Sequence, residues 1–352
     1  YTASKTGIFF SNHIKILANL LGKPIDEIGI TEQAIFHYTI GRRTLYKEIY
    51  RLNPGETFTF NLLDQKVIIK QAEKIFSHID KYRNDKEAVD AMYFDFIRGL
   101  KEISRKNLKY GLLLSGGLDS RLVGYGFKVQ EKEIASLTFG DDDNYEVIQA
   151  NKVANLLNSD HLVHSPADDY QLDADKLGRF IKIIGTINYP FLFSIPKLLN
   201  ELGADTISTG YACEAFLGGQ GYFLLGDKWS QKNRFRNAIF RSLGIPINFT
   251  IPSSKESINA FISDITRFHN NLIKKRKSYF SDEWQECYIS DLEEKIADEI
   301  FSEINRYLIN DPGSIQQIAE RFVFDTHGTK DINNINLFLM QYFPLVLPSL
   351  HH

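Results

Sequence analysis

Cysteine is scarce in this chain of 352 residues, which contains only Cys213 and Cys287. Two cysteines cannot form a disulfide framework or a cysteine-rich metal cluster, so a reducing compartment is the default and we expect a cytoplasmic protein. Long apolar runs are also missing. The best candidate, 337–347, is too short to cross a bilayer and is interrupted by Gln341 and Pro344. We therefore expect neither a membrane partner nor a signal peptide.

A marked excess of charge of either sign is missing as well. Lysine and arginine number 41 and aspartate and glutamate 44, which gives a formal net charge of −3. Such a balance does not favour binding to nucleic acid or to an anionic membrane. Basic clusters occur at 234–241 and 274–277, but no nucleic-acid-binding motif accompanies them. We expect no nucleic acid among the partners.

The rest of the composition is that of an ordinary globular protein, with 43 % hydrophobic and 24 % charged residues. A chain of this length can form two domains with sizeable cores. It starts at Tyr1 instead of methionine and ends soon after an apolar segment. We therefore expect a fragment that is truncated at both ends.

The clearest signal for function is Ser-Gly-Gly-Leu-Asp-Ser at 115–120, directly after the apolar run 112–114. The run predicts a buried strand, so the glycines form a turn and a helix begins after them. A helix N-terminus has unpaired N–H groups and a partial positive charge, which together hold phosphate. Glycine lets the backbone approach the anion, and the two serines add hydroxyl donors. The complete set indicates a nucleotide phosphate loop, whereas two glycines alone would indicate an ordinary turn.

An acid inside this loop needs a separate explanation. The carboxylate of Asp119 would repel a bare phosphate, so its position makes sense if Mg²⁺ lies between the two. No Gly-Lys-Ser/Thr ends the loop, which excludes the P-loop NTPase type. A second acidic run at 141–146 could bind a metal, but such runs more often form a solvated loop and a helix start.

From residue 110 onward, predicted strands and helices alternate along the chain. Apolar runs at 134–139 and 161–164 predict strands, with a helix between them. This alternation predicts an α/β fold, in which a parallel sheet with right-handed crossovers is flanked by helices. Ligands of such sheets lie beyond the carboxyl ends of the strands. We therefore expect Ser115, Phe139 and the end of a further short strand at 205–208 to lie at one edge.

The phosphate loop resembles that of the N-type ATP pyrophosphatases, which carry Ser-Gly-Gly-x-Asp-Ser, and within them the asparagine synthetase family. That family has a second motif, Ser-Gly-Glu-Gly-x-Asp-Glu-Leu-Phe-Gly-Gly, which aligns without gaps from Thr209 onward. Gly210 then keeps the glycine, Glu214 takes the metal-binding aspartate, and Tyr211 and Ala215 replace two glutamates. Glu214 still offers hard oxygen ligands, and the alternative is that it only caps the next helix. Tyr211 makes the motif similar to that of β-lactam synthetase, in which this tyrosine helps to deprotonate the attacking amine.

The first part of the chain resembles the tail of the glutaminase domain of the same family. The family pattern Gly-x-x-Thr-Leu-x-x-x-Ile-x-x-Leu-x-Pro-Gly is closely similar to 41–55. The resemblance starts inside that domain, so the catalytic N-terminal cysteine is not in this sequence. Cys213 and Cys287 cannot replace it, because the chemistry needs the free α-amine of the cysteine itself. The family's Pro-Phe-Leu-Asp segment and later catalytic lysine are not found, and Lys330 lies in the wrong context for that role.

We accordingly predict three parts of the chain. Residues 1–75 form the C-terminal part of a β-rich glutaminase-like (Ntn-type) domain, with a helix that starts at a cap at Thr31 and a later hairpin. Residues 76–109 form a helical connector whose apolar face packs on the next domain. Residues 110–352 form an asparagine-synthetase-like ATP pyrophosphatase domain, of the adenine nucleotide α-hydrolase-like type, with a mostly helical C-terminal part.

The resemblance implies an ATP-dependent ligase that adenylates a carboxylate and forms an amide with release of pyrophosphate and AMP. Aspartate and ammonia derived from glutamine are the expected substrates, and asparagine is the expected product. One alternative is another carboxylate or a substrate amine, as in β-lactam synthetase, and a second is a nucleotide-binding protein without catalysis. A tRNA-modifying or NAD- or GMP-synthesising relative would share the loop, but the segment 41–55 argues against it. A homodimer is a candidate assembly.

The resemblance also implies a set of site residues, with ATP and Mg²⁺ as cofactors. The residues implied to bind ATP are Leu114, Ser115, Gly116, Gly117, Asp119, Ser120, Phe139, Thr209 and Gly210. The implied Mg²⁺ ligands are Asp119 and Glu214, and the implied catalytic residues are Tyr211 and Asp119.

Overall fold

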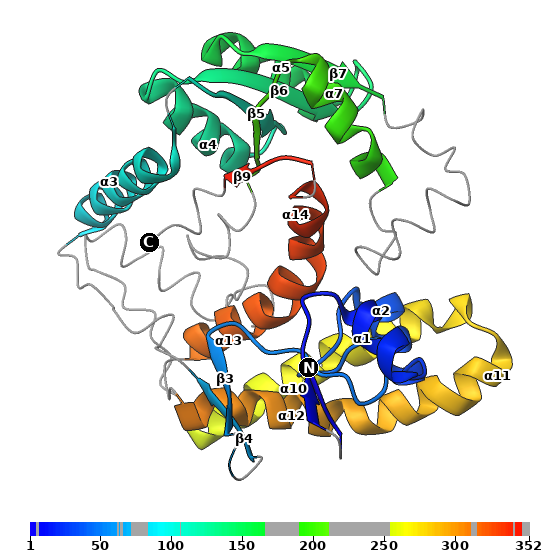
Figure 1. Ribbon diagram of the computed structural model, residues 1–352. Coiled ribbons are helices and arrows are strands. Elements are labelled where there is room, and N and C mark those ends of the chain that lie inside the picture. The colour runs from blue at the N-terminus through cyan, green and yellow to red at the C-terminus, as the bar shows by residue number, and fades with distance from the viewer. Residues whose placement is uncertain are drawn as a thin grey trace. The chain divides into compact units, whose positions relative to one another are not determined.

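The computed structural model divides the chain into two compact units (Figure 1). The first unit comprises Tyr1–Asp80 and Gly218–Asp331, and the second comprises Lys81–Leu217 and Ile332–His352. The structure describes residues 1–4, 7–61, 63, 66–71, 84–105, 107–165, 190–210, 254–310, 315–340 and 342–346.

The second unit is built on a five-stranded sheet in the order β7-β6-β5-β8-β9. Its strands are β5 (Lys109–Leu113), β6 (Glu133–Phe139), β7 (Asp160–His164), β8 (Thr206–Ser208) and β9 (Leu345–Val346). All four pairings are parallel, which confirms the predicted α/β fold with a parallel sheet. The strand at Leu345–Val346 was not expected from the sequence. This strand pairs with β8, and the Ser208 hydroxyl also donates a hydrogen bond to the Val346 carbonyl at 2.7 Å.

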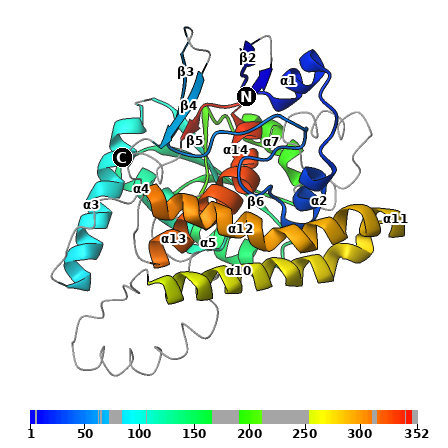
Figure 2. The ribbon, with the colours of Figure 1, turned by 90° about the horizontal axis from the view of Figure 1, so that it is seen from below.

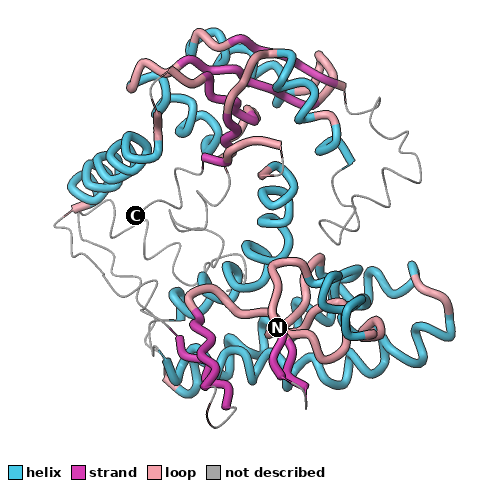
Figure 3. The backbone as a smooth tube through the Cα atoms, viewed as in Figure 1, coloured by secondary structure: helices cyan, strands magenta, loops and turns pink. Residues whose placement is uncertain are grey.

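Helices cover both faces of this sheet, as in other parallel sheets (Figures 1 and 3). They are α3 (Asp85–Ile103), α4 (Leu118–Val129), α5 (Tyr145–Leu157), α7 (Ile195–Glu201) and α14 (Asn333–Leu339). Alternate side chains of each strand point to opposite faces, so Tyr110 and Leu112 pack with α4 and α5, while Leu137 and Ile207 pack with α7 and α14. In the last turns of α3, Leu100 is fully buried in the first of these two cores. The assignment of 76–109 as a connector stays a prediction.

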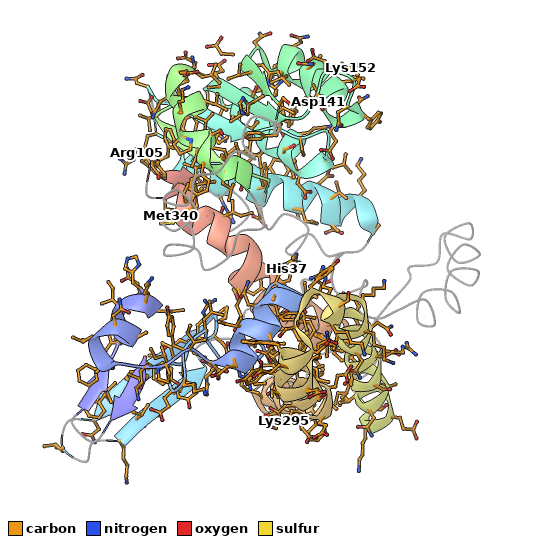
Figure 4. The ribbon with its side chains drawn as sticks, turned by 90° about the vertical axis from the view of Figure 1, so that its right-hand side faces the viewer. His37, Arg105, Asp141, Lys152, Lys295 and Met340 are labelled. Carbon is orange, nitrogen blue, oxygen red and sulfur yellow. The ribbon has the colours of Figure 1, made fainter. Side chains whose placement is uncertain are left out.

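The acidic run after β6 forms a loop and a helix start. The side chain of Asn144 caps α5 by accepting a hydrogen bond from the Glu146 N–H at 2.8 Å. Asp141 accepts a hydrogen bond from the Ser165 hydroxyl at 2.6 Å, and Figure 4 labels it. Among the residues that the structure describes, no group of three or more histidines, cysteines or acids could hold a metal ion.

The first unit combines two antiparallel hairpins with a helical core. The hairpins pair β1 (Thr2–Ser4) with β2 (Gly7–Phe9), and β3 (Glu56–Asn61) with β4 (Lys66–Gln71), and the second confirms the predicted hairpin. The helices are α1 (Ile14–Leu21), α2 (Glu27–Phe36), α10 (Lys255–Arg276), η3 (Lys277–Tyr279), α11 (Asp282–Trp284), η4 (Gln285–Ile289), α12 (Ser290–Asn310), α13 (Ile315–Val323) and η5 (Phe324–Ile332). Helices α10 and α12 lie side by side (Figures 1 and 2), and their apolar stripes meet α2 and α13 in one core.

The helix predicted to start at Thr31 starts earlier. Helix α2 begins at Glu27, and the carboxylate of Asp26 caps it by accepting from the Gly29 N–H at 2.9 Å. Thr31 is buried inside the helix, and its hydroxyl donates to the Glu27 carbonyl at 2.7 Å. A threonine can make this bond in a helix interior, so the residue type alone did not mark the helix start.

The two compact units follow packing and do not coincide with the predicted ranges 1–75, 76–109 and 110–352. Those ranges describe family modules, and the assignment of 1–75 to a glutaminase-like domain stays a prediction. In the described part of the chain, no helix has both the length and the hydropathy needed to span a membrane.

Candidate nucleotide-binding site

The predicted phosphate loop lies at the carboxyl edge of the parallel sheet. Strand β5 ends at Leu113 and helix α4 begins at Leu118, so Ser115 lies in the connection between them. In the sheet, β5 lies between β6 and β8, whose carboxyl ends are Phe139 and Ser208. The structure therefore brings Ser115, Phe139 and Thr209 to the same edge, where parallel sheets bind their ligands.

The loop is braced from inside by the hydroxyl of Ser120. This oxygen accepts a hydrogen bond from the Ser115 N–H at 3.1 Å, and it lies 3.1 Å from the Ser115 carbonyl and 3.4 Å from the Gly117 carbonyl. The residue is only 3 % exposed. Because a hydroxyl has a single hydrogen, its donor is used within the loop. Ser120 thus shapes the loop, and a contact with phosphate stays a prediction for this residue.

The N-terminus of α4 opens toward the loop without a side-chain cap. Gly117 occupies the cap position with an extended backbone, and among the described residues no side-chain cap hydrogen bond is made there. Ser115 is exposed and Asp119 is half-buried in the first turn of the helix. Uncapped helix amides and an exposed hydroxyl suit the oxygens of a phosphate group. The donor set therefore fits a phosphorylated ligand, with one carboxylate at hand for a divalent cation.

The chain that follows β8 packs directly on the start of α4. A Cβ atom placed on Gly210 would lie 2.8 Å from the Ser120 nitrogen and 2.9 Å from the Asp119 Cβ. Separations below about 3 Å do not occur between real atoms of these types, so only glycine fits here. Gly210 therefore packs directly against the helix start that follows the loop. Its part in binding ATP stays a prediction.

Two of the residues predicted to bind ATP, Leu114 and Phe139, lie just after β5 and at the end of β6. Leu114 is 2 % exposed, its N–H donates to the Leu137 carbonyl at 2.9 Å, and its carbonyl accepts from the Thr138 hydroxyl at 2.6 Å. The backbone N–H of Leu114 is therefore used within the sheet. Phe139 is half-buried, and its ring meets the His164 ring edge-on, with centroids 5.7 Å apart. Of the two, Phe139 is better placed to offer a surface to a base.

Sequence reasoning assigned no role to Arg121, which the structure places against the loop. Its guanidinium donates from Nη2 to the carbonyl of Gly116. The adjacent Gly117 N–H donates to the Ser115 hydroxyl at 3.2 Å. The signal that could have identified this arginine is its position one residue after the motif, in the first turns of the predicted helix.

Two predicted site residues lie outside the described ranges. Tyr211 and Glu214 follow the last described residue of the β8 segment, so their catalytic and metal-binding roles stay predictions. Lys330 is described and belongs to the first unit, where its ammonium donates to the carbonyls of Thr39 and Gly41. Burial lowers the pKa of this lysine to about 8. In the first unit it anchors the start of the 41–55 segment.

A comparison with known proteins identifies the family of this chain. Residues 100–327 match the family described as asparagine synthase, which is more than half of the chain. The chain therefore belongs to the asparagine synthase family, whose members are ATP-dependent amide ligases with a phosphate loop of this type. No curated protein matches the chain.

Among solved structures, an NMN synthetase from Francisella tularensis is similar over 74 % of this chain and 94 % of its own, at 13 % identity and a TM-score of 0.24. A TM-score this low supports no statement about the present chain.

Proposed function

We propose that this protein activates a carboxylate by adenylation with ATP and then forms an amide. The observation that carries the proposal is the loop between β5 and α4, with its uncapped helix amides, exposed Ser115 and nearby Asp119. Family membership supports ATP as the substrate of this loop. The pyrophosphate part of ATP would lie in the loop, where the amides offset its negative charge.

The proposed reaction has two steps. The substrate carboxylate forms a bond to the α-phosphorus of ATP, the bond to the β-phosphate oxygen breaks, and pyrophosphate leaves. Ammonia or an amine then attacks the acyl carbon, loses a proton, and expels AMP as the amide forms. Pyrophosphate carries the negative charge that develops in the first step, so the loop amides stabilise the state in which that charge appears. Mg²⁺ would offset further phosphate charge next to Asp119.

For the substrates, we propose aspartate as the carboxylate and glutamine-derived ammonia as the nitrogen source. Aspartate is favoured by family membership alone, since no described side chain selects it. The tyrosine at 211, in place of the family's glutamate, supports the competing proposal of an amine nucleophile. The two proposals differ in what must be added to the reaction and can be separated by experiment.

The test is to incubate the full-length protein with ATP, Mg²⁺ and aspartate, with either glutamine or ammonium, and to measure AMP, pyrophosphate and asparagine. We expect all three products. AMP release without asparagine, elicited by another carboxylate in a panel, would reject aspartate and retain the ligase. Binding of ATP in calorimetry with no pyrophosphate release from any carboxylate would reject the ligase and favour a non-catalytic nucleotide-binding protein.

A further inference from the structure

The peptide group between Gly116 and Gly117 is held from both sides. Its carbonyl accepts a hydrogen bond from Arg121 Nη2, and its N–H donates to the Ser115 hydroxyl at 3.2 Å. The carbonyl and N–H of a trans peptide point in opposite directions, so the two bonds together define one orientation of the peptide plane.

This peptide has little steric resistance to turning over. A flip changes ψ of the first residue and φ of the second by about 180°, and here neither residue has a Cβ atom. Gly117 has φ −77°, which a flip would carry into the positive range that residues with a side chain rarely adopt. The orientation at this point therefore depends on hydrogen bonds more than on backbone sterics.

The flipped orientation would harm a phosphate site. The N–H now points to the hydroxyl oxygen of Ser115, so a flip would turn the carbonyl oxygen toward the same place. Ser115 is the exposed hydroxyl of the loop. A carbonyl oxygen carries partial negative charge and would repel the phosphate oxygens that this part of the loop should receive.

The surroundings of Arg121 argue against a role in stability alone. Its Nε–H is buried and has no hydrogen-bond partner among the described residues. A buried donor without a partner costs stability, and such groups in proteins call for another explanation. The arginine keeps its Nη2 contact to Gly116 in spite of this cost.

We propose that Arg121 is a positioning residue that keeps the Gly116–Gly117 peptide in the orientation that receives pyrophosphate. This rests on the proposed function, because it assigns the loop to the pyrophosphate part of ATP. Arg121 acts through this peptide, so it affects the binding of the pyrophosphate part of the nucleotide. The base and ribose lie outside its influence.

The experiment compares Arg121→Met with Lys128→Met on the same helix. Lys128 also donates from a long cationic side chain to a backbone carbonyl, that of Leu156, but at the far end of α4. Calorimetry on the full chain measures the affinity for ATP with Mg²⁺, for pyrophosphate and for AMP. A charge-assisted hydrogen bond predicts about 10-fold weaker binding of ATP and pyrophosphate to Arg121→Met, with AMP affinity unchanged. Lys128→Met should bind all three ligands like the unaltered protein.

A double-mutant cycle tests the flip itself. Alanine at position 117 disfavours the flipped backbone, so Arg121→Met should weaken pyrophosphate binding less in the Gly117→Ala background than in the unaltered one. Arg121→Lys keeps a donor and should recover part of the affinity, which covers the case in which the methionine variant does not fold.

Three results would overturn the role of Arg121. Equal affinity of Arg121→Met and the unaltered protein for ATP and pyrophosphate would do so while leaving the proposed function intact. A parallel loss of AMP affinity would show general damage to the site. If the unaltered protein binds neither ATP nor pyrophosphate, the proposed function fails, and the role assigned to Arg121 fails with it.

Discussion

At the scale of single residues, the structure separates the exposed side chains of the loop from the side chains that shape it. Ser115 is exposed, whereas the hydroxyl of Ser120 is enclosed by the loop. The sequence motif contains both serines and could not distinguish them, because the difference depends on which way the first turn of α4 faces. Asp119 lies in that same turn and is half-buried.

Replacing Asp119 tests its role as the acid of the loop. Asp119→Asn preserves size but replaces the charged carboxylate with a neutral amide, whose oxygen is a weaker ligand for the cation proposed beside the pyrophosphate. We expect AMP release to fall by about 100-fold or more, in line with the several kcal/mol that a metal ion contributes to charge stabilisation. The control is Glu133→Gln, at the amino end of β6 and thus at the opposite edge of the sheet. Full activity of Asp119→Asn would remove the metal-binding role.

Because His269 is buried, we expect the stability of the first unit to depend on pH. Its Nδ1 lies 2.8 Å from the Ile265 carbonyl and its Nε2 lies 3.0 Å from the Tyr38 hydroxyl, an arrangement that suits the neutral ring with the proton on Nδ1. Burial lowers its pKa from 6.5 to about 4. Between pH 6.5 and about 4, His269 binds a proton in the unfolded chain but not in the folded chain. The stability of the folded state therefore falls as the pH drops through this range.

The expected loss of stability is about 3 kcal/mol, from a pKa difference of about 2.5 at about 1.4 kcal/mol per unit. Denaturant unfolding of the unaltered protein and of His269→Leu across this range measures it. The variant starts from lower stability but should lose about 3 kcal/mol less on acidification. Parallel pH profiles for the two proteins would contradict a neutral His269.

At the scale of secondary-structure elements, the site depends on how closely β8 and α4 approach each other. The segment after β8 passes so near to the first turn of α4 that Gly210 has no room for a side chain. The atoms it would meet belong to the helix start and cannot rotate away. The path of the chain after β8 is therefore sterically linked to the position of the start of α4.

Gly210→Ala should displace the start of α4 and weaken ATP binding by about 10-fold or more, because the loop amides would no longer converge on the pyrophosphate. Gly203→Ala is the matched comparison. Gly203 lies just before β8 with φ +71°, and no described atom lies within 4 Å of a Cβ atom placed on it, so alanine there strains the backbone without a contact to the loop. Calorimetric ATP titration and thermal unfolding of both variants separate the two effects. Equal ATP affinity of Gly210→Ala and the unaltered protein would show that the contact is not needed.

At the scale of the whole molecule, the chain forms two compact units, each assembled from separated segments. The nucleotide loop, its sheet edge and Arg121 all belong to the second unit, whereas Lys330 and His269 belong to the first. A ligand of the loop should therefore stabilise mainly the second unit. At a concentration about 100 times its dissociation constant, the gain is about 2.7 kcal/mol.

Hydrogen exchange measured by mass spectrometry can locate this effect. With ATP and Mg²⁺ we expect slower exchange in peptides from 107–165, which contain β5, α4 and β6. Peptides from 255–308, in α10 and α12, should exchange at nearly the same rate with and without ligand. AMP alone should protect the loop less, because it lacks the pyrophosphate. Protection confined to the first unit would contradict the placement of the nucleotide.

The strand, glycine turn and helix start at 109–120, the parallel strands at 109–164 and the asparagine-synthetase resemblance could be derived from the sequence alone. They depend on local patterns, a short apolar run followed by glycines and a helix start, which are encoded by neighbouring residues. Strand β9, the enclosure of Ser120, the close approach of Gly210 and the contact of Arg121 with Gly116 required the tertiary structure. Residues that meet across a sheet, or that turn inward from a helix start, are brought together by packing, and no local pattern records those contacts.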